Sequence, residues 1–158
     1  MSVEDAVSTK TLKPPAASLY DQDFATWTSE TARLLRARRF DQVDIEHVAE
    51  EIEDMGKSEK RELLSRLSVL ILHLLKWRYQ PDKQSPGWQS TIVTQRAELE
   101  RLLEDSPSLR RTVAASAAKV YPDAVEAACL ETALPPSAFP RECPFSGDQI
   151  LDRKFLPE

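Results

Sequence analysis

Glycine is scarce in this sequence: of its 158 residues, three are glycine, namely Gly56, Gly87 and Gly147. Tight β-hairpin turns need residues that tolerate a positive φ angle, and glycine is the usual choice. Folds built on many hairpins, such as β-sandwiches, are therefore disfavoured. Glycine-rich loops that cradle phosphate, and the sharp turn that exposes a catalytic serine in hydrolases, need more glycine than the chain has. The composition favours helices.

Cysteine is rare as well, with Cys129 and Cys143 the two present. One possible pair makes no disulfide framework, and the spacing matches no zinc-binding motif. Cys143 stands between Glu142 and Pro144 with no base nearby in sequence, which argues against a thiol enzyme. A reducing, cytoplasmic setting is the default for such a chain.

The sequence also lacks long apolar runs and any excess of positive charge. The longest apolar run, over 69–75, is interrupted by His73, whereas a membrane-spanning helix needs about 20 apolar residues. Residues 1–18 have no apolar core of the kind found in signal peptides. A net charge of −5 creates no general attraction for nucleic acid or acidic membranes. We therefore expect a protein partner or self-association, and no membrane association.

What the sequence does contain is helical periodicity. The stretch over 63–79 is apolar at almost every position from Leu67 onward, which predicts a long central helix over 58–79 with neighbours on nearly all sides. The other predicted helices cover 21–39, 44–55, 85–104 and a segment from Ser106 that either ends at Tyr121 or continues through Pro122. Gly56 would end the helix over 44–55 as a C′ residue.

These elements predict an all-α fold class: a single-domain bundle of five to six helices around the long central helix. We expect one all-helical domain over 19–158, preceded by a flexible tail over 1–18. Prolines crowd the chain after Leu134, which indicates an extended, Pro-rich C-terminal strap pinned by aromatic residues. One short helical turn is predicted within it, over 146–151.

The helix predicted over 44–55 carries an apolar seam. Its members recur at the spacing of heptad a and d positions: Ile45, Val48, Ile52 and Met55. The other faces of this helix are strongly acidic. A seam of this kind is typical of a helix that packs against another helix.

Two polar residues that interrupt the central helix mark the first candidate site. His73 and Lys76 lie three positions apart on one face, where a buried charge needs a polar partner. A tight turn between the second and third predicted helices would bring Glu50 and Glu51 back onto them. These groups either satisfy one another structurally or, together with Arg96, line a pocket for a ligand or for acid–base chemistry.

Two other sets of residues are candidate sites. His47 and Glu51 lie one helical turn apart and could hold a metal ion, although the motif lacks the second histidine of zinc proteases. We expect no metal there and place His47 at the surface. A group of arginines ends the first predicted helix: Arg33, Arg36, Arg38 and Arg39. They either complement the helix dipole or form a phosphate-binding patch for nucleic acid.

Several short segments together carry a resemblance to a known family. They are Tyr20 to Trp27, Glu50-Glu51-Ile52, His73-Leu74-Leu75-Lys76-Trp77, Trp88-Gln89-Ser90-Thr91-Ile92, Gln95-Arg96, Asp105-Ser106-Pro107-Ser108-Leu109, Glu131-Thr132, and Phe139-Pro140 with Cys143-Pro144-Phe145. In this order they resemble the bacterial family called domain of unknown function 29, over residues 19–158. The resemblance implies an all-helical, bacterial, cytoplasmic protein. It implies no activity, cofactor or catalytic residue.

The sequence shows no recognisable set of catalytic residues, and the apolar residues of the helix over 44–55 are spaced for contact with another helix. Both observations favour a non-enzymatic interaction or scaffold protein. Two alternatives stay open. The first is a ligand-binding protein or enzyme with a polar pocket formed by Glu50, Glu51, His73 and Lys76. The second is a nucleic-acid-binding protein that uses the arginines over 33–39. No motif points to a cofactor.

Overall fold

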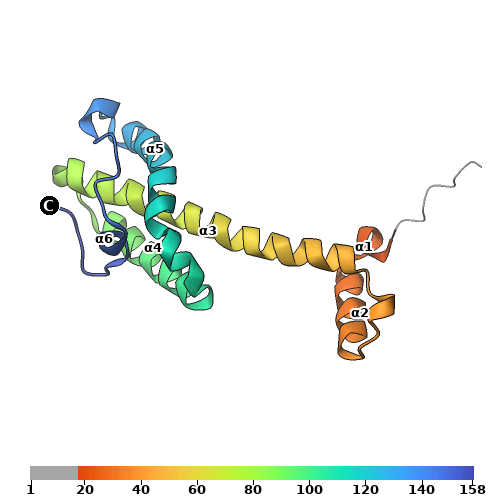
Figure 1. The fold of residues 1–158 in the computed structure, drawn as a ribbon. Helices are drawn as coiled ribbons and strands as arrows, with labels where there is room; N and C mark the ends of the chain where they lie inside the picture. Colours follow the sequence, from red (N-terminus) through yellow and green to blue (C-terminus); the bar gives the residue numbers. More distant parts are fainter. Residues whose placement is uncertain (1–17) are drawn as a thin grey trace, which may run out of the picture. The chain divides into compact units, whose positions relative to one another are not determined.

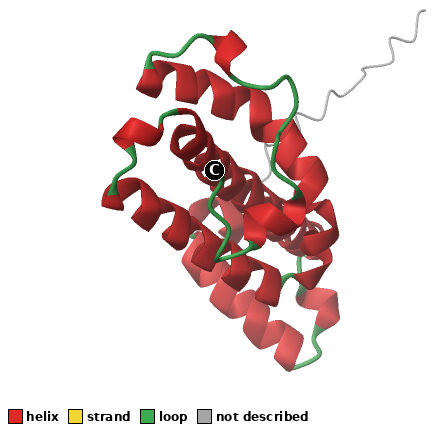
Figure 2. Cartoon of the chain, turned by 90° about the vertical axis from the view of Figure 1, so that its left-hand side faces the viewer, coloured by secondary structure: helices red, strands yellow, loops and turns green. Residues whose placement is uncertain are grey.

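The computed structural model describes residues 18–158 of the chain. Every regular element in this part is a helix, as Figure 2 shows, so the predicted all-α fold class is confirmed. Most of the predicted tail, residues 1–17, lies outside the described residues. The chain divides into two compact units, residues 1–52 and 53–158. The expectation of one domain over 19–158 stays a prediction.

The first unit begins with two short helices, α1 (Leu19–Gln22) and α2 (Phe24–Arg36). The sequence predicted one helix here, over 21–39. Asp23 divides it, because its backbone is not helical and its carboxylate accepts a hydrogen bond from the N–H of Thr26 at 2.9 Å. Aspartate is a strong N-cap, so it starts α2 instead of continuing α1.

The core of the first unit is small. Trp27, Leu34 and Val43 are the hydrophobic side chains buried in its described part, and Thr31 is buried with them. Val43 directly follows a short 3-10 helix, η1 (Phe40–Gln42). This core therefore draws on α2 and on the connection that leads from it.

The longest element is α3 (Ile45–Tyr79), which Figure 1 draws as one uninterrupted helix. The predicted separation of two helices at Gly56 is wrong. The glycines of the described residues have no positive φ angle, so Gly56 is an ordinary helical residue and not a left-handed stop. Glycine costs a helix about 1 kcal/mol relative to alanine, and the strong helix formers on both sides offset that cost.

The second unit packs around the C-terminal half of α3, where α4 (Pro86–Asp105) and α5 (Val113–Thr132) share its core. The largest fully buried side chains come mostly from α3: Leu63, Leu67, Leu70, Ile71, Leu74, Leu75, Ile92, Leu99 and Ile150. The predicted central helix is thus confirmed as the core element. No helix of the described residues is both long enough and apolar enough to cross a membrane.

Short 3-10 helices connect these elements. η2 (Pro81–Lys83) leads into α4, which Ser85 caps, as its sequence predicted, through a hydrogen bond from the N–H of Trp88. η3 (Pro107–Thr112) precedes α5. α5 then continues through Pro122, so the chain makes one helix where the sequence left two possibilities open.

Residues 133–158 form the C-terminal strap. It contains η4 (Pro136–Ala138) and α6 (Gly147–Leu151), the short helical turn predicted from the sequence. Phe139 and Phe145 are buried in the core of the second unit. The predicted aromatic-pinned strap is therefore confirmed.

Candidate functional site

Lys76 lies on α3 with only 5% of its surface exposed. Its ammonium donates a hydrogen bond to the carboxylate of Glu131 on α5 and lies 4.5 Å from the centroid of the Trp88 ring on α4. A buried cation needs such partners, because burying an unpaired charge is very costly. The side chain of Glu131 is 47% exposed, so solvent reaches this ion pair from the side of the carboxylate. The arrangement ties three helices together.

His73, one turn before Lys76, is half-buried. Its Nδ1 lies 2.9 Å from the carbonyl oxygen of Val69, so Nδ1 carries the proton that it donates to that oxygen. Burial lowers the pKa of His73, and the positive charge of Lys76 lowers it further. The imidazole is therefore neutral at neutral pH and acts as a satisfied structural group.

The predicted contact of Glu50 or Glu51 with His73 or Lys76 is wrong. It required the chain to reverse after the second predicted helix, and α3 makes no reversal there. Lys76 takes its carboxylate from Glu131 instead. The polar ligand pocket that was predicted from these residues therefore loses its basis.

Glu51 belongs to a different polar cluster, which joins α1 to the start of α3. The hydroxyl of Tyr20 donates to Oε1 of Glu51 at 2.6 Å, and the Tyr20 ring stacks on His47 with 4.0 Å between ring centroids. Asp44 lies 2.5 Å from Nδ1 of His47, and this hydrogen bond raises the pKa of His47. Both candidate metal ligands thus have other partners. The described residues contain no group of three side chains that could hold a metal ion.

Arg96 is the most deeply buried arginine described, with 3% of its surface exposed. Its guanidinium donates to the carbonyl oxygens of Ile150 at 2.8 Å, Phe155 at 2.7 Å and Gln149 at 3.1 Å. Gln149 and Ile150 lie near the end of α6, where carbonyls have no partner inside the helix. Arg96 therefore caps α6 and holds the strap against α4.

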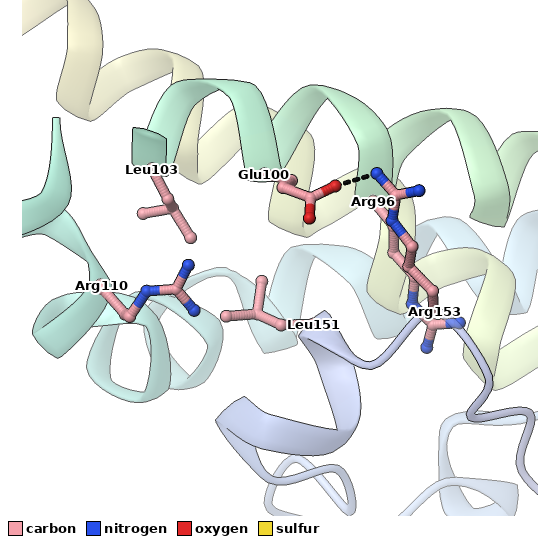
Figure 3. A pocket seen from close by; sticks show the side chains of 6 residues that line it. All are labelled: Arg96, Glu100, Leu103, Arg110, Leu151 and Arg153. Atoms are coloured by element: carbon pink, nitrogen blue, oxygen red, sulfur yellow. Dashed lines mark hydrogen bonds and ion pairs between the residues drawn. The ribbon is translucent and has the colours of Figure 1, made fainter. Parts of the chain in front are cut away.

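A shallow pocket lies beside Arg96 (Figure 3). Its lining is mostly charged: Arg96, Glu100, Leu103, Arg110, Leu151 and Arg153. Arg153 donates to Glu100, which the dashed line in Figure 3 marks. These side chains offer charge for binding, but the lining includes no histidine, cysteine or serine for acid–base or nucleophilic chemistry.

The arginines over 33–39 lie at the end of α2 and just beyond it. Arg33 donates to both carboxylate oxygens of Glu30, at 2.9 and 2.6 Å, which neutralises part of the cluster. Arg36, Arg38 and Arg39 are exposed. Positive charge at a helix C-terminus is also what the helix dipole favours. A nucleic-acid surface at these residues stays a prediction.

Two further groups that could act chemically are protonated at neutral pH. Burial raises the pKa of Cys143, whose Sγ lies 3.6 Å from the carbonyl oxygen of Phe145. Burial likewise raises the pKa of Tyr121 to about 12, and its hydroxyl donates to the carbonyl oxygen of Pro140 at 2.8 Å. Neither group is an activated nucleophile or base.

The apolar residues predicted on the first part of α3 are uncovered in the structure. Ile45 is 54% exposed, Ile52 is 63% exposed and Met55 is 69% exposed, while Val48 is half-buried. We call Ile45, Ile52 and Met55 the α3 seam. They follow one another along a single helix at intervals that return to the same face.

Residues 19–156 match the model of a protein family described as Domain of unknown function DUF29. The chain belongs to this family. The match agrees with the resemblance that its sequence segments carry. No curated protein and no solved structure matches the chain. The function of this DUF29 chain therefore has to be argued from its own residues.

Sequence reasoning missed the partners of Lys76 and Arg96, the buried cations among the described residues of this DUF29 chain. Glu131 is 55 positions from Lys76, and no local spacing indicates such a pair. The partners of Arg96 are backbone carbonyls, which leave no side-chain pattern. One signal was present: Arg96 lies four residues after Ile92 and three before Leu99, on the apolar face of its helix.

We expect the two histidines of the chain to titrate on opposite sides of about 6.5, the ordinary imidazole pKa. His47 should titrate above it because of its hydrogen bond to Asp44, and His73 should titrate below it because of burial. Imidazole C–H chemical shifts, followed by NMR against pH and assigned with His47→Gln, measure both values. Equal pKa values for the two rings would contradict the account.

The lowered pKa of His73 also determines how this residue changes the stability of the protein with pH. Folded His73 binds its proton less tightly than unfolded His73, so below about pH 6.5 the unfolded state takes up more protons. The contribution of His73 to stability is therefore present at neutral pH and is lost as the pH falls. His47, whose pKa is raised, acts in the opposite direction.

Proposed function

We propose that this DUF29 protein is a non-enzymatic interaction module and that the α3 seam is its binding surface. One observation carries the proposal: Ile45, Ile52 and Met55 are each more than half exposed and share one face of one helix. Single exposed hydrophobic residues are ordinary on protein surfaces. A row of them at heptad spacing is what a helix presents to a partner helix.

The small core of the first unit supports this proposal. Its described part buries three large hydrophobic side chains and exposes twice as many: Leu19, Phe24, Leu35, Phe40, Ile45 and Ile52. Small units bury a smaller fraction of their surface than large ones and are correspondingly marginal in stability. A partner that covered this apolar surface would supply the missing burial.

The buried polar groups of the second unit support a non-enzymatic role. Lys76 is engaged with Glu131, and Arg96 with backbone carbonyls of the strap, so both serve the fold. We also propose a bacterial, cytoplasmic location, as the family resemblance implies. Cys129 and Cys143 are both free thiols, which suits a reducing compartment.

Site-specific photo-cross-linking tests the proposal. Benzoylphenylalanine replaces Ile52 on the seam or, as a matched control, Glu50 on the far side of the same helix. After irradiation of cells that make the protein, we expect a discrete heavier adduct from position 52 and none from position 50. Mass spectrometry of the adduct should identify a helical segment of the partner.

A second substitution makes the result specific to the seam. Ile45→Ser, combined with the photo-reactive residue at position 52, should abolish the adduct because it removes the neighbouring apolar contact. An absent adduct, or equal adducts from positions 52 and 50, would overturn the proposed function.

A further inference from the structure

We propose that the pocket beside Arg96 binds a small oxyanion, either free phosphate or the phosphate group of a small molecule. The pocket lies in the second unit and includes no residue of the α3 seam, so this site is independent of the proposed function. Three properties of the pocket point to such a ligand: the charges of its lining, the donors that these leave unused, and its size.

The charges of the lining do not balance. Its charged residues are three arginines, Arg96, Arg110 and Arg153, and one acid, Glu100, which leaves two positive charges in excess. The whole protein has a net charge of −5, so this excess is a local feature of the pocket. Like charges that lie near one another repel, and a bound anion would relieve that repulsion.

The three guanidinium groups differ in how far they are compensated. Arg153 donates to Glu100, so these two charges offset each other. Burial lowers the pKa of Arg96 and the carboxylate of Asp152, just outside the lining, raises it, so Asp152 offsets part of the charge of Arg96. Arg110 makes no hydrogen bond or ion pair with any other of residues 18–158. Its charge is therefore the one that most needs a ligand.

Arg110 and Arg96 both have donors to offer. The guanidinium of Arg110 points from η3 toward the space between Leu103 and Leu151 (Figure 3). Arg96 is 97% buried, and three of the five N–H groups of its guanidinium donate to carbonyl oxygens of the strap. Its other two have no partner among the described residues. Guanidinium groups bind phosphate strongly because their planar fork of donors matches the phosphate oxygens.

The size of the pocket limits the ligand to a small group. Its free space is about 70 Å³, whereas sites for drug-sized molecules have about 300–1,000 Å³. Phosphate fits such a space, and the rest of a phosphorylated small molecule would extend into solvent. A phosphate monoester carries a charge of about −1.5 to −2 at pH 7, which matches the excess of the lining.

A bound phosphate would join three segments of the second unit. Arg96 belongs to α4, Arg110 to η3, and Arg153 to the strap. A ligand that binds the folded state but not the unfolded state raises stability as its concentration rises. We therefore expect phosphate to stabilise the protein and to hold the strap against α4 and η3.

Isothermal titration calorimetry of the full-length protein tests the inference. The probes are inorganic phosphate and phenyl phosphate, each titrated into chloride buffer at a constant ionic strength of about 0.15 M. We expect one anion to bind per chain. Equal or tighter binding of inorganic phosphate identifies free phosphate as the ligand, and tighter binding of phenyl phosphate identifies the phosphate group of a small molecule. Binding of neither probe would overturn the inference.

Two pairs of matched variants locate the site. Arg110→Gln should weaken phosphate binding at least about tenfold, because a hydrogen bond between charged groups is strong. Arg111→Gln changes an exposed neighbour outside the lining and should alter affinity by less than about twofold. Glu100→Gln frees Arg153 and should tighten binding about threefold. Glu126→Gln makes the same charge change at an exposed residue of α5 outside the lining and should have no measurable effect.

Proteolysis gives a second readout of the same site. Phosphate should slow tryptic cleavage after Arg153 in the native protein and in Arg111→Gln, but not in Arg110→Gln. Urea titration in chloride should show that Arg110→Gln is as stable as the native protein, because Arg110 has no partner to lose. Equal losses of phosphate binding in the Arg110 and Arg111 variants, or binding that Arg110→Gln leaves unchanged, would overturn the inference.

Discussion

Replacing Arg96 with methionine is expected to lower the free energy of unfolding by about 3–5 kcal/mol. Methionine keeps an unbranched side chain and a similar helix propensity but is shorter and removes all the donors. Three carbonyl oxygens of the strap then lose their partner: those of Gln149, Ile150 and Phe155. Hydrogen bonds from a charged donor contribute about 1.5–3 kcal/mol each, and a buried acceptor left without one is costly.

Chemical denaturation measures this loss, and Arg101→Met is its control. Arg101 is on the same helix but is 69% exposed and pairs with Glu98 at 3.0 Å, so its loss should cost no more than about 1 kcal/mol. Tryptic cleavage after Arg153 should also become faster in the Arg96 variant, because the strap is no longer held. Equal stability of the Arg96 and Arg101 variants would show that the strap does not depend on this cap.

The second large effect is expected in the centre of α3. Leu67 is fully buried, and Leu67→Ala should lower the free energy of unfolding by about 2–5 kcal/mol through lost burial and the cavity left behind. Ile52→Ala on the same helix should change it by no more than about 0.5 kcal/mol, because that side chain is 63% exposed. The two substitutions remove similar volumes, so burial is the difference between them.

Urea titrations of the two variants at one temperature make the comparison. The contrast separates the part of α3 that holds the fold from the part that faces solvent. A loss at Ile52 as large as that at Leu67 would mean that the seam is packed inside the protein.

Local sequence signals predicted much of the fold. The apolar stretch over 63–79 indicated the central helix, Ser85 followed by Pro86 marked the start of α4, and the prolines with Phe139 and Phe145 indicated the strap. Each of these signals acts within a few residues. The error at Gly56 shows their limit, because a glycine stops a helix only when the chain needs a positive φ there. That need depends on tertiary packing, which local patterns do not contain.

The candidate sites were harder to predict, for a related reason. Because His73 and Lys76 lie in an apolar helix, the sequence predicted that each would have a polar partner, and in the structure each has one. The sequence did not show which residues these partners are, since Glu131 comes from a helix far along the chain. The α3 seam was visible as a pattern, but periodicity does not tell whether the chain itself or a partner covers it. That distinction required the exposed fractions of Ile45 and Ile52.

The most direct test of the account is the stability of Gly56→Ala. α3 continues without a break through Gly56, and the seam lies on the part of this helix that precedes the glycine. In a continuous helix with open space around the position, alanine should raise the free energy of unfolding by about 0.5–1 kcal/mol. If Gly56 instead ended a helix with a positive φ, alanine would lower it by about 1–2 kcal/mol, and this loss would contradict the account.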